Sequence, residues 1–264
     1  MRHKYRDGKW LLYISYPDRT LWRCRSDGSE REQLTFAPMM VFYPRISPDG
    51  TRVAFNGFMT DSGFGVYQLP MKGGTPEKVV EEWGHAPAWS LDGNSLAYAA
   101  LRAGHHYMDG GHWLEIHVVN LQTKKGSVIP TDDNWFGPWW PQPDKLIAAA
   151  SVSGPPGEPH LFDFRTHKWS KLGGDFGVLN WAPSPDGKYL YLLASDSQSN
   201  KVRRLRASDF KIEVIADVAG VRLVSDDSLT ASSGGWIGLA ADGSPTLTHD
   251  VGSDEIYALD VKWP

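Results

Sequence analysis

Short runs of alternating apolar and polar residues recur along the chain, and tight turns separate them. In the clearest copy, Pro44 and Ile46 share one face of a first run, and Val53 and Phe55 share one face of a second. Alternation with a period of two predicts β-strands that bury one face. The turn between the runs, Ser-Pro-Asp-Gly at 47–50, has Pro and Gly where a turn needs a fixed φ and a permissive φ. The pattern therefore predicts a β-hairpin.

The hairpin is repeated along the chain. The aspartates at equivalent turn positions are Asp7, Asp49, Asp92, Asp144, Asp186 and Asp242. Most of the intervals are roughly 40–45 residues, a period that predicts a β-propeller with one four-stranded blade per repeat. The length of 264 residues then accommodates about six blades. The expected fold class is therefore all-β.

A single propeller domain is expected, with an incomplete closing blade. The approximate blades are 1–36, 42–80, 85–129, 136–172, 179–218 and 236–264. The first blade lacks a recognisable first strand, and the last reaches Pro264 before a fourth strand. Either the two ends pair, for example through Arg2–Tyr5, or the sequence is an excerpt of a longer protein. An open ring would leave blade edges exposed, which favours self-association.

Composition narrows the possible classes of protein. The net charge is −4, so we expect no nucleic acid to bind through this domain. Cys24 is the single cysteine, which excludes an internal disulfide and predicts a buried structural residue. The chain has no apolar segment at its start and no run of about 18 apolar residues, so we expect a soluble chain with neither signal peptide nor membrane segment. The compartment stays open, and the periplasm fits if the sequence is an excerpt of a membrane-anchored regulator.

Two copies of the repeat carry a resemblance to a known family. Pro-Arg-Ile-Ser at 44–47 and Pro-Ala-Trp-Ser at 87–90 each lead into an Asp-Gly turn and an aliphatic-aromatic strand. This resembles the TolB-type, WD-like β-propeller repeat, and Ile-Tyr-Ala-Leu-Asp at 256–260 is also typical of it. The stretch 21–50 looks like the C-terminal propeller of large bacterial sensory, transcriptional-regulator or kinase proteins. The resemblance implies a non-catalytic domain that binds an unknown protein or small-molecule ligand within a larger signalling protein.

Histidines form the best candidate for chemistry. His85 precedes the first strand of the third blade, and His105, His106 and His112 lie with Asp109 in a long loop of the same blade. Imidazoles and a carboxylate could hold a first-row metal ion, so these five residues are weak metal candidates. Their spacing matches no metal-binding signature, and loop histidines bonded to water or backbone are the simpler interpretation. We therefore predict no cofactor, and the sequence has no nucleotide-binding or hydrolase motif.

Aromatic residues form a second candidate, because several fall at or near the start of first strands. A ring of aromatics at a channel mouth suits a sugar, a peptide or another small ligand. The alternative is packing between blades, which we expect for Trp139, Trp140 and Trp181. The predicted ligand-binding residues are His85, Trp83, Trp135, Tyr43, Trp236, His105 and His112.

Three functions remain open from the sequence. The first is a non-catalytic ligand- or protein-binding propeller. The second is a metal-assisted lyase or hydrolase with a His-rich site at the channel mouth. The third is a structural scaffold that docks another protein through a blade edge. The turn aspartates are expected to cap their own turns, because Asp side chains accept hydrogen bonds from nearby backbone amides.

Overall fold

The computed structural model describes residues 2–4, 10–105, 114–131, 134–151, 157–184, 186–223, 237–240 and 243–247. Every named element in these ranges is a β-strand. No helix capable of crossing a membrane occurs in this part of the chain.

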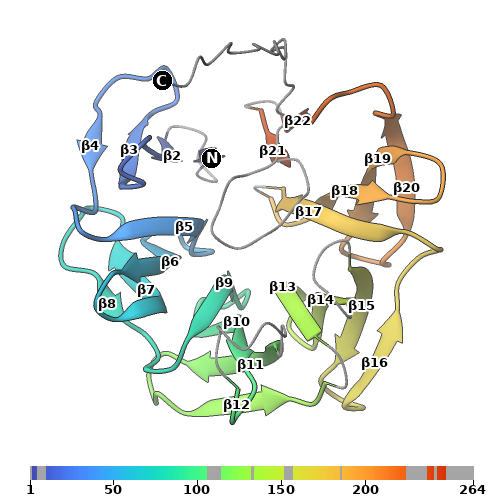
Figure 1. Cartoon of the computed structure of the whole chain (residues 1–264), viewed down its shortest axis with the longest axis horizontal. Helices are drawn as coiled ribbons and strands as arrows, with labels where there is room; N and C mark the ends of the chain where they lie inside the picture. Colours follow the sequence, from blue (N-terminus) through green and yellow to red (C-terminus); the bar gives the residue numbers. More distant parts are fainter. Residues whose placement is uncertain are drawn as a thin grey trace, which may run out of the picture.

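Five antiparallel sheets of four strands each surround a central axis (Figure 1). The first contains β1 (Arg2–Lys4), β2 (Trp10–Ile14), β3 (Leu21–Arg25) and β4 (Glu32–Gln33). The second contains β5 (Met40–Ile46), β6 (Arg52–Met59), β7 (Gly63–Pro70) and β8 (Glu77–Lys78). The third contains β9 (Gly84–Trp89), β10 (Ser95–Leu101), β11 (Leu114–Asn120) and β12 (Gly126–Ile129). The fourth contains β13 (Asn134–Gln142), β14 (Lys145–Ser151), β15 (Glu158–Asp163) and β16 (Lys168–Lys171). The fifth contains β17 (Gly177–Pro183), β18 (Tyr189–Ser195), β19 (Asn200–Arg206) and β20 (Ile212–Asp217).

The predicted all-β propeller is confirmed, with five complete blades in the described residues. After the fifth blade, β21 (Ile237–Leu239) pairs with β22 (Pro245–Leu247), and β21 contacts both β17 and β1. The rest of the predicted sixth blade lies outside the described residues. The expectation that the first blade lacks its first strand is wrong, because β1 pairs with β2 and places Arg2 opposite Tyr13.

Each innermost strand from β5 to β17 is irregular where it pairs with the second strand of its blade. The register shifts between Phe42 and Arg45 in β5, and equivalent shifts occur in the third, fourth and fifth blades. In the first three of these strands the backbone is left-handed, with φ of 47° at Tyr43, 51° at Ala86 and 58° at Gly137. Such bulges bend a strand and redirect its side chains. They therefore help to decide which inner-strand residues face the central axis.

The Ser-x-Asp turns follow the innermost strands and share one hydrogen-bond pattern. Ser47 Oγ donates to Asp49 Oδ1 at 2.6 Å, and Thr51 N donates to the same oxygen at 3.0 Å. Arg52 N in turn donates to Ser47 Oγ at 2.9 Å. The turns at 90–95 and 184–189 repeat all three bonds. Asp49, Asp92 and Asp186 thus act within their own turns, as the sequence predicts.

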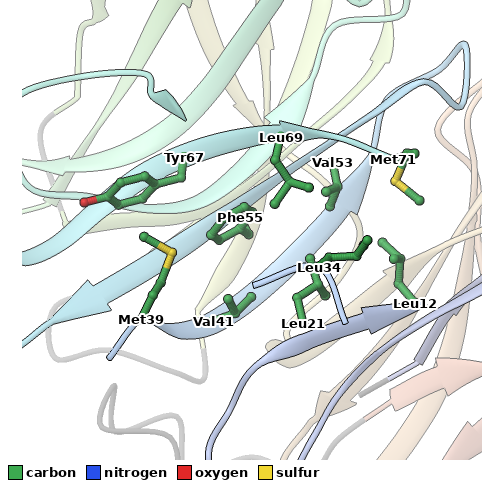
Figure 2. Packing of buried hydrophobic residues seen from close by; sticks show 10 residues of the cluster. All are labelled: Leu12, Leu21, Leu34, Met39, Val41, Val53, Phe55, Tyr67, Leu69 and Met71. Atoms are coloured by element: carbon green, nitrogen blue, oxygen red, sulfur yellow. The ribbon is translucent and has the colours of Figure 1, made fainter. Parts of the chain in front are cut away.

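The apolar core lies between neighbouring blades, which is the usual arrangement in a repeat fold. Figure 2 shows the cluster between the first two sheets, in which Leu12 and Leu21 face Val53, Phe55 and Leu69. Similar clusters join each blade to the next, as far as β21. Stability therefore depends on contacts between successive blades as much as on any single sheet.

Candidate functional site

A cavity of about 190 Å³ lies at the end of the innermost strands that carries the Ser-x-Asp turns. The ends of β5, β9, β13, β17 and β21 contribute its walls, and these strands surround the central axis in Figure 1. Its aromatic lining consists of Trp89, Trp139, Trp140 and Trp181. Among the described residues that line it, Arg45 is the one charged side chain, and none is Asp or Glu.

Trp89 is fixed in the cavity wall from two sides. Its Nε1 donates a hydrogen bond to the carbonyl oxygen of Arg45 at 2.9 Å, which ties β9 to β5. The guanidinium of Arg52 lies 4.7 Å from the centre of the Trp89 ring, within the range of a cation–π contact. Arg52 is itself held by a 2.7 Å hydrogen bond to the carbonyl oxygen of Gly93. The indole therefore has a fixed orientation before any ligand arrives.

The tryptophans of the fourth and fifth blades belong to both the core and the cavity. Trp140 stacks on Phe164 with ring centroids 5.1 Å apart, and its neighbours are the buried side chains shared by the third and fourth blades. Trp181 packs in the next cluster, between the fourth and fifth blades. The space beside Trp181 requires glycine, because a Cβ on Gly137 would lie 2.7 Å from Trp181 Cζ2. Packing between blades thus positions rings that also line the cavity.

Arg45 brings a positive charge into these apolar surroundings. Burial lowers the pKa of its guanidinium to about 10, and the nearby Tyr43 acts weakly in the opposite direction. The group stays protonated at neutral pH. Its Nη1 donates to the carbonyl oxygen of Pro44 at 3.2 Å. The described lining of the cavity therefore combines aromatic surfaces with one cationic side chain.

Three of the predicted site residues meet outside the cavity, around His85 near the start of β9. The Tyr43 ring lies edge-on to His85 with centroids 4.7 Å apart, and Trp83 stacks on His85 at 5.8 Å. Both ring nitrogens of His85 are buried and have no hydrogen-bond partner within the described ranges. Burial accordingly lowers the pKa of His85 to about 4. None of these three aromatic residues lines the cavity.

The backbone on both sides of His85 is fixed by one buried amide. Asn56 Nδ2 donates to the carbonyl oxygen of Gly84 at 2.5 Å, and Ala86 N donates to Asn56 Oδ1 at 2.6 Å. Asn56 lies on β6 and is fully buried. It therefore joins the second blade to the first strand of the third blade.

The other predicted site residues do not join this group in the described structure. Trp135 is only 2% exposed and packs 4.0 Å from Trp169 and 5.1 Å from His160, ring centre to ring centre. It lies in the core between the third and fourth blades, which corresponds to the packing alternative. His105 is half-buried just after β10, where its backbone N donates to the carbonyl oxygen of Arg102.

Four of the predicted ligand and metal candidates lie outside the described residues: Trp236, His106, Asp109 and His112. The part of the chain that is described holds no group of three His, Cys, Asp or Glu side chains arranged to bind a metal ion. The histidine-loop site thus stays a prediction.

Sequence reasoning missed the cavity and the position of Arg45 in its wall. A usable signal was the position of Trp89 and Arg45 beside the Ser-x-Asp turns, at the ends of their strands. The sequence interpretation placed the ligand at the start of the inner strands instead. The residues beside these turns resembled ordinary packing residues in the sequence, because they continue the alternation of apolar and polar residues along their strands.

No family model matches the chain. The Uncharacterized protein Atu1656 of Agrobacterium fabrum is 32% identical over 237 residues, which cover 68% of this chain and 80% of that protein. Among solved structures, a TolB candidate from Agrobacterium tumefaciens superposes with a TM-score of 0.68 at 19% identity, over 83% of this chain and 80% of that one. An oligogalacturonate lyase in complex with manganese gives a TM-score of 0.64 at 14% identity, over 92% and 68% of the two chains. At such identities, the two structures establish the fold alone. The chain belongs to the same family as Atu1656, and its fold is that of the TolB-type β-propellers.

Proposed function

We propose that this propeller is a non-catalytic binding domain that holds a small ligand, or a short segment of a partner protein, in the cavity at the turn end of its inner strands. The observation that carries the proposal is the cavity itself, in which four tryptophans and one arginine converge from four blades. Aromatic surfaces combined with a few polar groups are typical of sites for sugars, peptides and other small ligands.

The dimensions favour a small ligand. Drug-sized ligands occupy cavities of roughly 300–1,000 Å³. The present cavity measures about 190 Å³, so it suits one sugar ring or one to two amino-acid residues. A larger partner would therefore insert only a terminal group or a side chain and rest the remainder on the surrounding turns.

The fixed geometry of the cavity also supports binding. Trp89 is oriented by its bond to the Arg45 carbonyl oxygen, and Trp140 by its stack on Phe164. A site that is already ordered loses little conformational entropy when a ligand binds, which raises affinity. Since the fold hosts many functions, the proposal rests on this site and not on the propeller as such. A place within a larger bacterial signalling protein is part of the same proposal.

Thermal unfolding with a panel of monosaccharides and dipeptides tests the proposal, because a ligand that binds the native state raises Tm. The informative variant is Trp139→Ala, which removes a half-buried ring from the cavity wall. Trp22→Ala is the matched control, since Trp22 is also half-buried but lies on β3, away from the cavity.

We expect at least one panel member to raise the Tm of the wild type and of Trp22→Ala, but not of Trp139→Ala. A ligand that shifts all three proteins equally binds elsewhere and contradicts the proposed location. No shift and no change in tryptophan fluorescence with any panel member would contradict the binding function itself.

A further inference from the structure

We infer that Leu91 selects the ligand of the cavity, and that this ligand is a short peptide segment that presents an apolar side chain to it. The inference rests on the binding function proposed above and adds the chemical class of the ligand and a residue that recognises it. It starts from an exposed leucine in the cavity wall, in a turn whose two closest copies have proline instead.

The turn that contains Leu91 does not require a leucine. Leu91 takes the second position of the turn at 90–93, where the equivalent turns at 47–50 and 184–187 have proline. Proline suits this position because its fixed φ matches the turn. The hydrogen bonds of the turn at 90–93 are made by its serine, its aspartate and its glycine. The leucine side chain therefore has no role in the geometry of the turn.

Leu91 is not part of the core either. None of the apolar clusters between the described blades includes it, and the residue is 41% exposed. Among the exposed large hydrophobic residues of the described ranges, it is the one that lines the cavity. Its turn lies beside another turn of the cavity wall, because Pro48 Cδ is 3.7 Å from the position that a Cβ on Gly93 would take. A single exposed leucine is ordinary, but one that continues the apolar lining of a cavity indicates a surface for a ligand.

The polar groups of the lining favour an apolar side chain over a sugar. Apart from the tryptophans, the polar side chains of the described lining are Arg45, Ser47 and Ser184. Each serine donates its hydroxyl proton to the aspartate of its own turn, at 2.6 Å from Ser47 and 2.7 Å from Ser184. Arg45 has partners within the protein, among them the carbonyl oxygen of Pro44. A buried sugar would therefore find few side-chain partners for its hydroxyl groups, and an unpaired buried hydroxyl is unfavourable.

A peptide that carries an apolar side chain avoids this penalty. The cavity of about 190 Å³ accommodates one such side chain, and Leu91 extends the apolar surface that the side chain can cover. Each CH₂ group that binding removes from water raises the affinity about fourfold. Changes to the side chain of the ligand, or to Leu91, therefore have measurable effects on the dissociation constant.

The test compares two blocked dipeptides that differ only in their side chains, N-acetyl-Leu-Leu amide and N-acetyl-Gly-Gly amide, with methyl glucoside as the sugar. Dissociation constants are measured on the full chain by calorimetry and by tryptophan fluorescence. Leu91→Ser removes the apolar surface, and Leu91→Pro introduces the residue of the equivalent turns. Val128→Ser is the matched control, because Val128 is 51% exposed on β12 and does not line the cavity.

We expect the wild type and Val128→Ser to bind the leucine peptide at least 10-fold more tightly than the glycine peptide or the glucoside. Leu91→Ser and Leu91→Pro should each bind the leucine peptide at least fourfold more weakly, whereas their affinity for the glycine peptide should change less than twofold. Leu91→Pro should keep the Tm of the wild type or raise it, since proline in a compatible turn restricts the unfolded chain. This variant separates recognition from folding if Leu91→Ser is unstable.

Three results overturn the inference in different ways. Equal binding of the two peptides, tighter binding of the glucoside, or unchanged affinity of folded Leu91→Pro for the leucine peptide refutes it and leaves the binding function standing. Failure of both Leu91 variants to fold shows that Leu91 is a structural residue and refutes its role in selection. Binding of none of the three compounds also refutes the inference, and a negative result in the wider panel of monosaccharides and dipeptides refutes the proposed function as well.

Discussion

Replacement of Asn56 by Ala should destabilise the ring at the junction of the second and third blades. The side chain is fully buried on β6 and bonds the carbonyl oxygen of Gly84 at 2.5 Å and the amide of Ala86 at 2.6 Å. Alanine removes both partners and leaves a backbone C=O and a backbone N–H without compensation. Each such buried group costs about 1–3 kcal/mol, so the free energy of unfolding should fall by about 2–5 kcal/mol.

Urea unfolding followed by tryptophan fluorescence measures this loss. The midpoint should decrease for Asn56→Ala while the slope of the transition stays constant, which indicates a change in stability alone. Asn94→Ala is the matched control, because Asn94 is exposed and its side chain bonds only the turn carboxylate of Asp92. We expect the control to lose less than about 0.5 kcal/mol, as is usual for a surface substitution. Equal midpoints for the two variants would refute the idea that Asn56 joins these blades.

Three further predictions concern His85, Gly137 and Phe55. Burial lowers the pKa of His85 to about 4, below its ordinary 6.5, so the unfolded chain takes up the proton at a higher pH than the folded chain does. The free energy of unfolding should therefore fall by about 2–3 kcal/mol as the pH drops from 6.5 toward 4. Urea titrations at several pH values should show this dependence for the wild type and a weaker one for His85→Gln. Gly137→Ala places a Cβ at φ 58° and 2.7 Å from Trp181, whereas Gly28→Ala has φ 87° and no atom within 4 Å; the first should therefore lower Tm clearly more than the second, and equal losses would show that the contact with Trp181 is unimportant. Phe55→Ala empties a fully buried position in the core between the first two blades and should lower the free energy of unfolding by about 3–5 kcal/mol, while a loss below 1 kcal/mol would contradict the packing in Figure 2.

The repeat made most of the fold predictable. The turn at 47–50 has a local chemical signature, and its spacing counts the blades without any knowledge of their contacts. The segment Arg2–Lys4 was not predicted as the first strand of the first blade, because its three polar residues show no alternation. Pairing with β2, which only the folded ring reveals, makes this segment a strand.

The candidate site was predictable only in part. The structure places His85 beside Tyr43 and Trp83, which the sequence grouped with it as ligand-binding candidates, and their binding role stays a prediction. Trp135 starts its strand in the same way, yet it lies in the core. Bulges in the inner strands decide which side chains face the axis, and alternation alone does not locate them. Arg45 became a candidate only when five inner strands were placed around one cavity.

The most direct test of the central claim is the Tm of wild type and Trp139→Ala with the panel of monosaccharides and dipeptides. At a ligand concentration of 100 times Kd, binding stabilises the native state by about 2.7 kcal/mol, which corresponds to a rise of roughly 5–10 °C for a chain of this size. The proposed cavity predicts such a rise for the wild type with at least one panel member, and none for Trp139→Ala. Equal rises for both proteins, or no rise for the wild type with any member, would contradict it.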